Sequence, residues 1–331
     1  MNNPSLLNVL HLKKSFSVSA GLFSRAPVKN MAVNDVSFSL QKGETLGLVG
    51  ESGCGKSTIA RLVLLLETPD SGEILFEGKN ILSFTKGETK VFRRKVQIVF
   101  QDPFSSLNPR KKVGSIIGEP LLIHKLVPGN MIQDKVFELM ELVGLQKDSI
   151  DRYPHEFSSG QRQRIGIARA LSLSPELIVA DEPVSALDVS IQAQTINLLM
   201  DLQKQMHLTY LFISHDLSVV RYVSTRVAVM YLGKIVELAS RENLYTAPVH
   251  PYTEALLSAV PEPDPEQKKQ RIILKGDVPN PFNPPRGCVF SSRCPMAEQN
   301  ICFELQPPLE EKRTGHWAAC YLKKCGQDVR S

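Results

Sequence analysis

The 331-residue sequence has no run of about 20 consecutive apolar residues, the length that a membrane-spanning helix needs. Its most apolar patches, such as residues 62–66, are far shorter. Residues 1–8 also lack the basic start and long apolar stretch of a signal peptide. The net charge of +5, from 39 basic and 34 acidic residues, is too small to argue for nucleic acid. We therefore expect a cytoplasmic protein. Any function at a membrane would require a partner protein.

The composition is that of a folded protein, with 42% hydrophobic and 22% charged residues, and the length suits one large α/β domain with an appendage or two domains. Residues 1–48 are predicted to form short strands, among them a half-buried strand at 33–40 where apolar and polar residues alternate. Flanking glycines predict another strand at 72–78. Continuous apolar runs predict buried parallel strands at 45–49, 96–100, 177–180 and 210–213.

Helical spacing of apolar residues marks the rest of the first 250 positions. Residues 103–157 are predicted to be mainly helical, including a helix over 131–143. Ser158 is a good N-cap for a helix that ends near Leu171. A further helix is expected over 191–206, and a hairpin over 227–238 that turns at Gly233.

A glycine-rich loop connects the predicted strand at 45–49 to a predicted helix at 57–66. It matches the phosphate-loop pattern G-x-x-x-x-G-K-[ST] and comprises Gly50, Glu51, Ser52, Gly53, Cys54, Gly55, Lys56, Ser57 and Thr58. The glycines free backbone N–H groups to surround phosphate oxygens, and the helix N-terminus favours the same anions. Lys56 is expected to bridge the outer phosphates, Ser57 to hold Mg²⁺ and Thr58 to lie near the inner phosphates. The alternative is a chance match in a glycine-rich turn, and Cys54 is interpreted as a small loop residue.

Polar side chains follow three of the predicted buried strands. Asp181 is expected to reach Mg²⁺, and Glu182 to polarise the attacking water. His215 is expected to contact the γ-phosphate, and Gln101 to bind Mg²⁺ or the water. Each has a plainer alternative when taken alone: a solvated acidic turn, a structural histidine or an ordinary polar strand end. Because parallel sheets gather ligands at the carboxyl ends of their strands, the combination predicts an ATP-hydrolysing site. No Asn-Lys-x-Asp motif for guanine occurs.

The segment 157–164, Phe-Ser-Ser-Gly-Gln-Arg-Gln-Arg, resembles the signature motif of ATP-binding cassette (ABC) ATPases. With Ser185-Ala186-Leu187-Asp188 and the residues above, the resemblance covers residues 6 to about 245. Further segments look like the oligopeptide/dipeptide importer subfamily, namely 101–103, 106–110, 153–155, 250–257, 287–290 and 293–295.

This resemblance implies an α/β fold of the P-loop NTPase class. Its RecA-like core would carry an antiparallel β subdomain and an inserted helical subdomain at about 102–160. The nucleotide-binding domain would span residues 1–248, and a small, loop-rich, cysteine-containing C-terminal module residues 249–331. The composition also changes after residue 248, because eleven of the 22 prolines lie between Pro251 and Pro308.

The resemblance also implies roles and partners. Phe16 would stack on adenine; Ser158, Gly160 and Gln161 would meet ATP held by a second cassette; Asp188 would belong to the loop that crosses that interface. The chain would be the ATPase subunit of a bacterial dipeptide or oligopeptide importer, peripheral at the cytoplasmic face of the inner membrane. Its partners would be a second ABC ATPase, two transmembrane permease subunits docked near Gln101 and a periplasmic or extracellular substrate-binding protein, with no nucleic acid. A nickel or glutathione importer, or a non-transport cassette, is the alternative.

Two departures from the usual L-S-G-G-Q signature bear on this expectation. Phe157 stands in place of leucine, and Ser159 in place of the first glycine. Ser159 adds a Cβ beside the phosphate of the opposite site, which predicts an asymmetric heterodimer.

The other five cysteines lie in the last 44 residues, a clustering that favours metal over disulfides in a cytosolic chain. Cys288, Cys294, Cys302 and Cys320 offer four thiolates, with Cys325 spare. Such ligands suit an iron–sulfur cluster or structural Zn²⁺, and unligated thiols are the third possibility. The resemblance favours a 4Fe-4S cluster.

Overall fold

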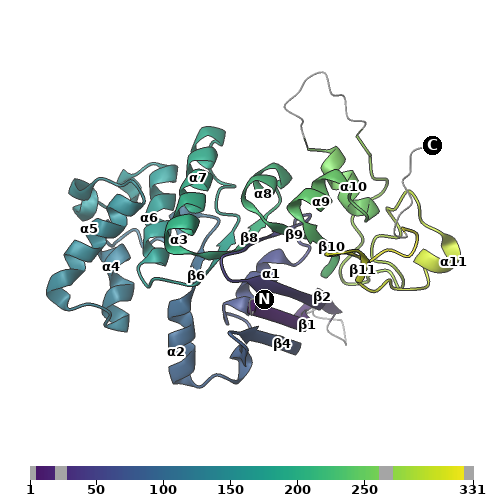
Figure 1. The fold of residues 1–331 in the computed structure, drawn as a ribbon, viewed down its shortest axis with the longest axis horizontal. Helices are drawn as coiled ribbons and strands as arrows, with labels where there is room; N and C mark the ends of the chain where they lie inside the picture. The colour runs from purple at the N-terminus through teal and green to yellow at the C-terminus, as the bar shows by residue number, and fades with distance from the viewer. Residues whose placement is uncertain (1–4, 19–27, 261–270, 324–331) are drawn as a thin grey trace. The chain divides into compact units, whose positions relative to one another are not determined.

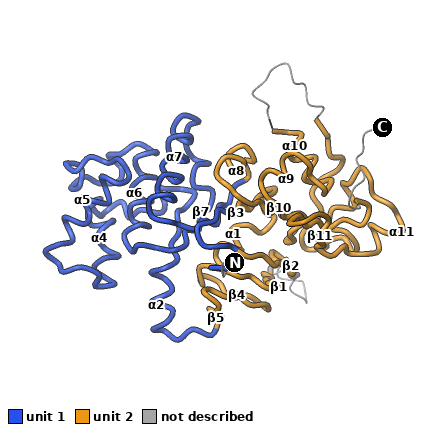
Figure 2. The backbone as a smooth tube through the Cα atoms, viewed as in Figure 1, with its two compact units in different colours: residues 1–6, 40–45, 83–214 blue, residues 7–39, 46–82, 215–331 orange. Residues whose placement is uncertain are grey.

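The computed structural model describes residues 5–18, 28–260 and 271–323. The chain divides into two compact units, each made of segments that are distant in sequence (Figure 2). Unit 1 takes residues 1–6, 40–45 and 83–214, and unit 2 takes residues 7–39, 46–82 and 215–331. Among the described residues, no helix combines the length and the apolar character needed to cross a membrane.

Unit 1 contains three neighbouring parallel strands, β6 (Val96–Val99), β7 (Leu177–Asp181) and β8 (Thr209–Ser214). β8 is buried along its whole length, as its continuous apolar run predicts. The register places Asp181 opposite Ile213, so the polar residues that follow these strands leave the same edge. The three predicted strands are confirmed to within a residue or two.

The helices of unit 1 pack on one another and on these strands (Figure 1). They are α2 (Lys86–Lys95), α3 (Pro103–Ser106), α4 (Val113–His124), α5 (Ile132–Leu142), α6 (Ser159–Leu171) and α7 (Val189–Met206), with 3₁₀ turns at Gly129–Met131, Lys147–Asp151 and Pro154–Glu156. α4, α5 and α6 contact each other in pairs, and α3 packs on α6. The predicted helices at 131–143, 158–171 and 191–206 are confirmed.

Unit 2 begins with a four-stranded sheet in the order β2-β1-β4-β5. The strands are β1 (Ser5–Val18), β2 (Val28–Gln41), β4 (Ser71–Phe76) and β5 (Lys79–Asn80), followed by a 3₁₀ turn at Ile81–Ser83. β1 pairs antiparallel with β4, and β4 with β5, as expected for an antiparallel β subdomain. β1 and β2 have 14 residues each, so the short strands expected in this region are corrected to long ones.

A second set of strands in unit 2 carries the phosphate loop. β3 (Thr45–Val49) pairs in parallel with β9 (Arg226–Tyr231), which forms the predicted hairpin with β10 (Lys234–Ser240). On the other side of β10 lie β12 (His316–Ala318) and then β11 (Glu310–Arg313), both antiparallel. The helices of this unit are α1 (Lys56–Val63), α8 (Leu217–Val223), α9 (Arg241–Thr246), α10 (Pro251–Ser258) and α11 (Gln299–Cys302). β12, which follows residue 248, therefore pairs with β10, which precedes it. The domain boundary at residue 248 stays a prediction.

Candidate functional site

The phosphate loop leaves β3 and enters α1, and a Cβ would not fit at two of its glycines. Gly50 and Gly55 have φ values of 152° and 109°, in the region that favours glycine. A Cβ at Gly50 would collide with the Met230 carbonyl oxygen, and one at Gly55 with the Ala32 carbonyl oxygen. Gly55 is also the N-cap of α1, so the first helical N–H groups point into the loop.

Lys56, the first residue of α1, is buried with its ammonium inside the loop. Its Nζ donates to the carbonyl oxygens of Gly50 at 2.8 Å and Glu51 at 3.0 Å. Cys54 is buried beside it, and burial raises the pKa of the Cys54 thiol. This environment supports a structural role for Cys54, because the neutral thiol is a poor nucleophile. The loop therefore gathers one cation and several backbone donors, a suitable setting for phosphate groups.

Within unit 1, the structure brings together two of the predicted strand-end residues. Gln101, which follows β6, donates from Nε2 to Glu182 Oε2 at 2.9 Å. Glu182 directly follows β7, has a φ of 47°, and donates its backbone N–H to the Ile213 carbonyl of β8 at 2.9 Å. A non-glycine residue in this region is uncommon, and such backbone geometry often accompanies function. Asp181, at the end of β7, is half-buried.

Gln163 is a residue that the sequence reasoning did not single out. It is fully buried on α6, and its Nε2 donates to the carbonyl oxygens of Pro183 at 2.7 Å and Phe100 at 3.4 Å. These two hydrogen bonds connect α6, the helix of the signature segment, to the backbone of the residue before Gln101 and of the residue after Glu182. One feature of the sequence indicated its role: Gln163 is the second glutamine in 157–164, and it places an amide on an otherwise apolar face of the predicted helix.

The signature segment forms the start of α6. Ser158 caps the helix by accepting the Gln161 N–H at 3.3 Å, and Gln161 Oε1 accepts the Ser158 N–H at 3.1 Å, a capping box. A Cβ at Gly160 would collide with the Ile191 side chain of α7. Phe157 is buried, so the larger side chain in place of leucine serves the core, whereas Ser159 is half-buried in the first helical turn.

The remaining predicted site residues lie at element ends or on strands. His215 is exposed and directly follows β8, and the next residue, Asp216, caps α8. Asp188 is exposed at the N-cap position of α7. Phe16 lies half-buried on β1, with the Lys14 ammonium 5.3 Å from its ring centroid. Phe16, residues 50–58 and His215 belong to unit 2, and the others belong to unit 1.

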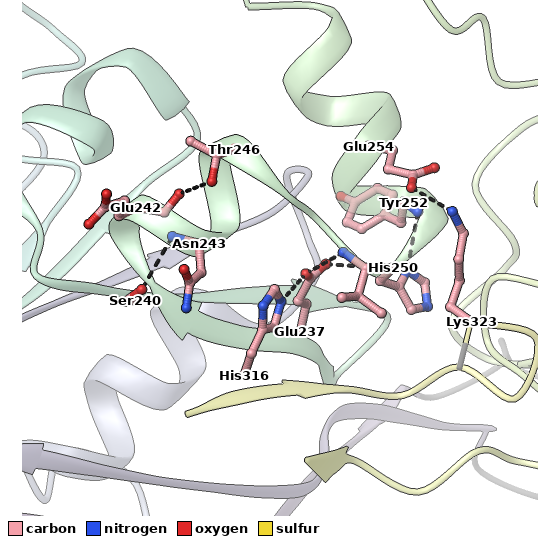
Figure 3. Close-up of polar contacts among 11 residues, drawn as sticks. Glu237, Ser240, Glu242, Asn243, Thr246, His250, Tyr252, Glu254, His316 and Lys323 are labelled. Atoms are coloured by element: carbon pink, nitrogen blue, oxygen red, sulfur yellow. Dashed lines mark hydrogen bonds and ion pairs between the residues drawn. The ribbon is translucent and has the colours of Figure 1, made fainter. Parts of the chain in front are cut away.

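Two contacts of the C-terminal segments were not predicted from the sequence. In the phosphate loop, Glu51 contacts Arg293 and Tyr252. On β10, the buried Glu237 accepts the N–H of His250, the N-cap of α10, and contacts His316 of β12 (Figure 3). Apart from Glu237 and His250, which are 13 residues apart, these pairs are separated by 79 to 242 residues, so a local pattern cannot reveal them.

The cysteines expected to bind a metal are Cys288, Cys294, Cys302 and Cys320, and all four are free thiols. Cys288 donates its N–H to the Cys302 carbonyl at 2.8 Å, and burial together with the charges of the other three thiols raises the pKa of Cys288 to about 11. Yet the described part of the chain contains no group of three or more histidine, cysteine or acidic side chains arranged to hold a metal ion. The geometry therefore does not support the predicted cluster or zinc site. Cys325 lies outside the described residues.

Comparison with known proteins gives the family. Residues 33–185 match the ABC transporter family, and residues 236–302 match the oligopeptide/dipeptide transporter C-terminal region. The oligopeptide transport ATP-binding protein AppF of Bacillus subtilis is 55% identical, over 97% of this chain and 98% of its own length. The dipeptide transport ATP-binding protein DppF of Haemophilus influenzae is 52% identical, over 96% of this chain and 97% of its own.

A solved structure supports the same assignment. The ATP-binding cassette MJ0796, in a dimeric post-hydrolysis state bound to ADP and Pi, superposes with a TM-score of 0.63 at 25% identity, covering 71% of this chain and 98% of its own. The P-loop NTPase fold expected from the sequence is thereby confirmed. The chain belongs to the ABC transporter family of ATPases, in the group that carries the oligopeptide/dipeptide transporter C-terminal region.

Proposed function

We propose that this chain is the ATP-binding and ATP-hydrolysing subunit of a bacterial importer for dipeptides or oligopeptides. The observation that carries the proposal is the presence, in one chain, of the ABC transporter region at 33–185 and the oligopeptide/dipeptide C-terminal region at 236–302. Relatives named for dipeptide and oligopeptide transport match almost the whole chain. ATP hydrolysis would drive substrate uptake through membrane permease subunits.

Within this proposal, the phosphate loop holds the ATP phosphates through its N–H groups and Lys56. Ser57, Asp181 and Gln101 offer the oxygen ligands that Mg²⁺ prefers, and the bound ion would neutralise phosphate charge. Glu182 polarises the attacking water, and its hydrogen bond from Gln101 supports this role because the bond orients the carboxylate.

The remaining residues of the proposed ATP site would contact the nucleotide or the second cassette. His215 contacts the γ-phosphate, Phe16 stacks on adenine, and Thr58 lies near the inner phosphates. Ser158, Gly160 and Gln161 meet ATP held by a second cassette, and Asp188 lies in the loop at that interface. The capped start of α6 supports this role, since a helix N-terminus is a favourable place for phosphate oxygens.

The proposed assembly is a heterodimer with a second ABC ATPase, bound to two permease subunits and served by a periplasmic or extracellular substrate-binding protein. The chain would lie peripherally at the cytoplasmic face of the inner membrane. The heterodimer rests on Ser159, which would weaken one of two otherwise equivalent ATP sites.

On their number and clustering alone, we propose the four cysteines of the tail as an iron–sulfur or zinc site, to be decided by metal analysis. Protein purified without oxygen and assayed for iron, sulfide and zinc tests this proposal. Absorption near about 400 nm would support a cluster. Colourless protein free of both metals would leave the thiols as a structural group.

Co-purification of the tagged chain from its own cell membranes tests the transport proposal. Recovery of permease subunits and a second cassette would support it, and recovery of ribosomes would contradict it. Deletion of the gene, followed by uptake of labelled dipeptide, nickel and glutathione, distinguishes the substrates. Loss of dipeptide uptake alone is expected.

The catalytic role of Glu182 has its own test. Glu182→Gln in the purified complex should lower ATP hydrolysis by roughly 10²- to 10³-fold while ATP binding persists, because only the water-activating carboxylate is lost. Glu141→Gln is the matched control, since Glu141 pairs with Lys147 on the exposed surface of the same unit. Rapid hydrolysis by Glu182→Gln would contradict the assignment.

A further inference from the structure

The phosphate loop carries a negative side chain of its own, Glu51, and the C-terminal segments hold it. Arg293 Nη1 lies 2.9 Å from Glu51 Oε2 and 3.1 Å from Oε1. The backbone N–H of Glu51 donates to the Tyr252 hydroxyl at 3.0 Å. Both the carboxylate and the amide of this loop residue are therefore fixed by groups from beyond residue 250.

The ion pair is partly shielded from water. The Arg293 side chain is 11% exposed and the Glu51 side chain 27%, so solvent screens the pair less than it screens surface pairs. Arg293 Nη1 also donates to the Tyr231 hydroxyl at 3.4 Å, and the guanidinium carbon lies 5.9 Å from that ring centroid. These contacts hold the guanidinium in one place.

A buried aromatic cluster supports both partners of Glu51. The rings of Tyr231, Tyr252 and Phe290 lie 4.6 to 5.3 Å apart, and all three side chains are almost fully buried. Phe290 precedes Arg293 by one turn, and the Arg293 N–H donates to the Phe290 carbonyl at 3.1 Å. Because aromatic packing of this kind is rigid, it determines where Arg293 and the Tyr252 hydroxyl lie.

The arrangement matters for an anionic ligand. A carboxylate in a phosphate-binding loop repels the phosphates unless a cation neutralises it. Glu51 is also linked to Lys56, whose ammonium donates to the Glu51 carbonyl, so displacement of Glu51 would disturb the lysine as well.

We propose that Arg293 is a positioning residue of the nucleotide site. It neutralises Glu51 and, together with Tyr252, holds the phosphate loop, so that the C-terminal segment sets the affinity of the chain for ATP. This inference rests on the proposed nucleotide site at residues 50–58.

Equilibrium binding of a fluorescent ATP analogue to the full-length chain tests the proposal. Arg293→Met should weaken binding about tenfold, as expected for loss of a charge-assisted contact. Glu51→Gln should bind at least as tightly as the wild type, because a negative charge near the phosphates is removed. The double variant Glu51→Gln/Arg293→Met should recover to within about threefold of Glu51→Gln, since the charge that Arg293 neutralises is gone.

Conservative variants separate positioning from general loss of structure. Arg293→Lys should retain most of the affinity, because a single nitrogen already serves both carboxylate oxygens. Tyr252→Phe, which removes only the acceptor of the Glu51 N–H, should raise the dissociation constant by a smaller factor than Arg293→Met. If Arg293→Met lowers the melting temperature, Arg293→Gln is used in its place. The double variant Glu51→Gln/Arg293→Gln should then bind ATP to within about threefold of Glu51→Gln.

Two controls complete the experiment. Lys323→Ala breaks the Lys323–Glu254 pair, 2.8 Å long in the same unit, and should leave ATP binding unchanged. Lys56→Ala should abolish binding, and unchanged binding by that variant would overturn the nucleotide site itself. Loss of binding by Lys56→Ala combined with wild-type affinity of Arg293→Met would overturn only the role of Arg293. A double variant as weak as Arg293→Met would also refute the mechanism through Glu51.

Discussion

Glu237 on β10 is a buried carboxyl group that three groups of the C-terminal segments contact (Figure 3). Its Oε1 accepts the Val249 N–H at 2.7 Å and contacts His316 Nε2 at 2.6 Å, while Oε2 accepts the His250 N–H at 2.9 Å. Both Glu237 and His316 are inaccessible to water. Glu237→Ala would therefore leave two backbone donors and one imidazole without this partner in a dry environment.

The size of the effect follows from these three donors. Each buried donor left without a partner costs about 1–3 kcal/mol. Because some of the donors will relax toward water, we expect Glu237→Ala to lower the free energy of unfolding by about 4 kcal/mol. Glu237→Gln keeps one acceptor oxygen but turns an NH₂ group toward a donor, so a loss of about 2–3 kcal/mol is expected.

Urea unfolding followed by circular dichroism measures this difference, with the slope m checked for a change in the unfolding mechanism. The matched control is Glu254→Ala, which breaks a more exposed pair with Lys323 and should cost less than about 1 kcal/mol. A loss below about 1 kcal/mol for Glu237→Ala, or equal losses for the two variants, would refute the reasoning.

Two other variants test further features. Burial lowers the pKa of His250 from 6.5 to about 4, so the folded state keeps the ring neutral while the unfolded state takes up a proton. Stability should thus fall by about 2–3 kcal/mol as the pH drops from 6.5 to 4.5. His250→Asn, which retains a capping side chain, should show a pH dependence shallower by that amount, and identical pH profiles would argue against the effect. Ser159→Gly should leave ATP hydrolysis of the assembled complex unchanged or raise it, because it removes a Cβ from the first turn of α6; a large fall in the ATPase rate would count against the predicted asymmetry.

The elements that the sequence predicted well are those whose signals are local. The apolar run of β3 gives its bounds to the residue, and the serine at the start of α6 forms the capping box expected of it. β1 and β2 were underestimated because alternation of apolar and polar residues is visible over only part of each strand. The length of a strand depends on its partners in the sheet, which a local pattern does not contain.

The candidate site shows the same division. The order of strand, loop and helix predicted the phosphate loop, but the hydrogen bond from Gln101 to Glu182 spans 81 residues and required the parallel register of three strands. The number and clustering of the tail cysteines indicated a metal site that the geometry of the described residues does not support. A count of cysteines gives the number of available ligands, whereas a metal site also requires their sulfur atoms to converge.

The contacts of Glu51 and Glu237 give the C-terminal segments a role that composition alone would not suggest. Proline-rich chain with few regular elements resembles an appendage, yet both carboxylates receive their donors from residues beyond 248. Removing donors from a buried carboxylate destabilises a protein by more than the lost contact, because the desolvation penalty of the charge remains. One of these carboxylates supports the sheet next to β9, and the other lies in the phosphate loop that follows β3, the parallel neighbour of β9. The tail therefore contributes to the stability of this unit through Glu237 and to the electrostatics of its phosphate loop through Glu51, and the two contributions are separable because different residues carry them.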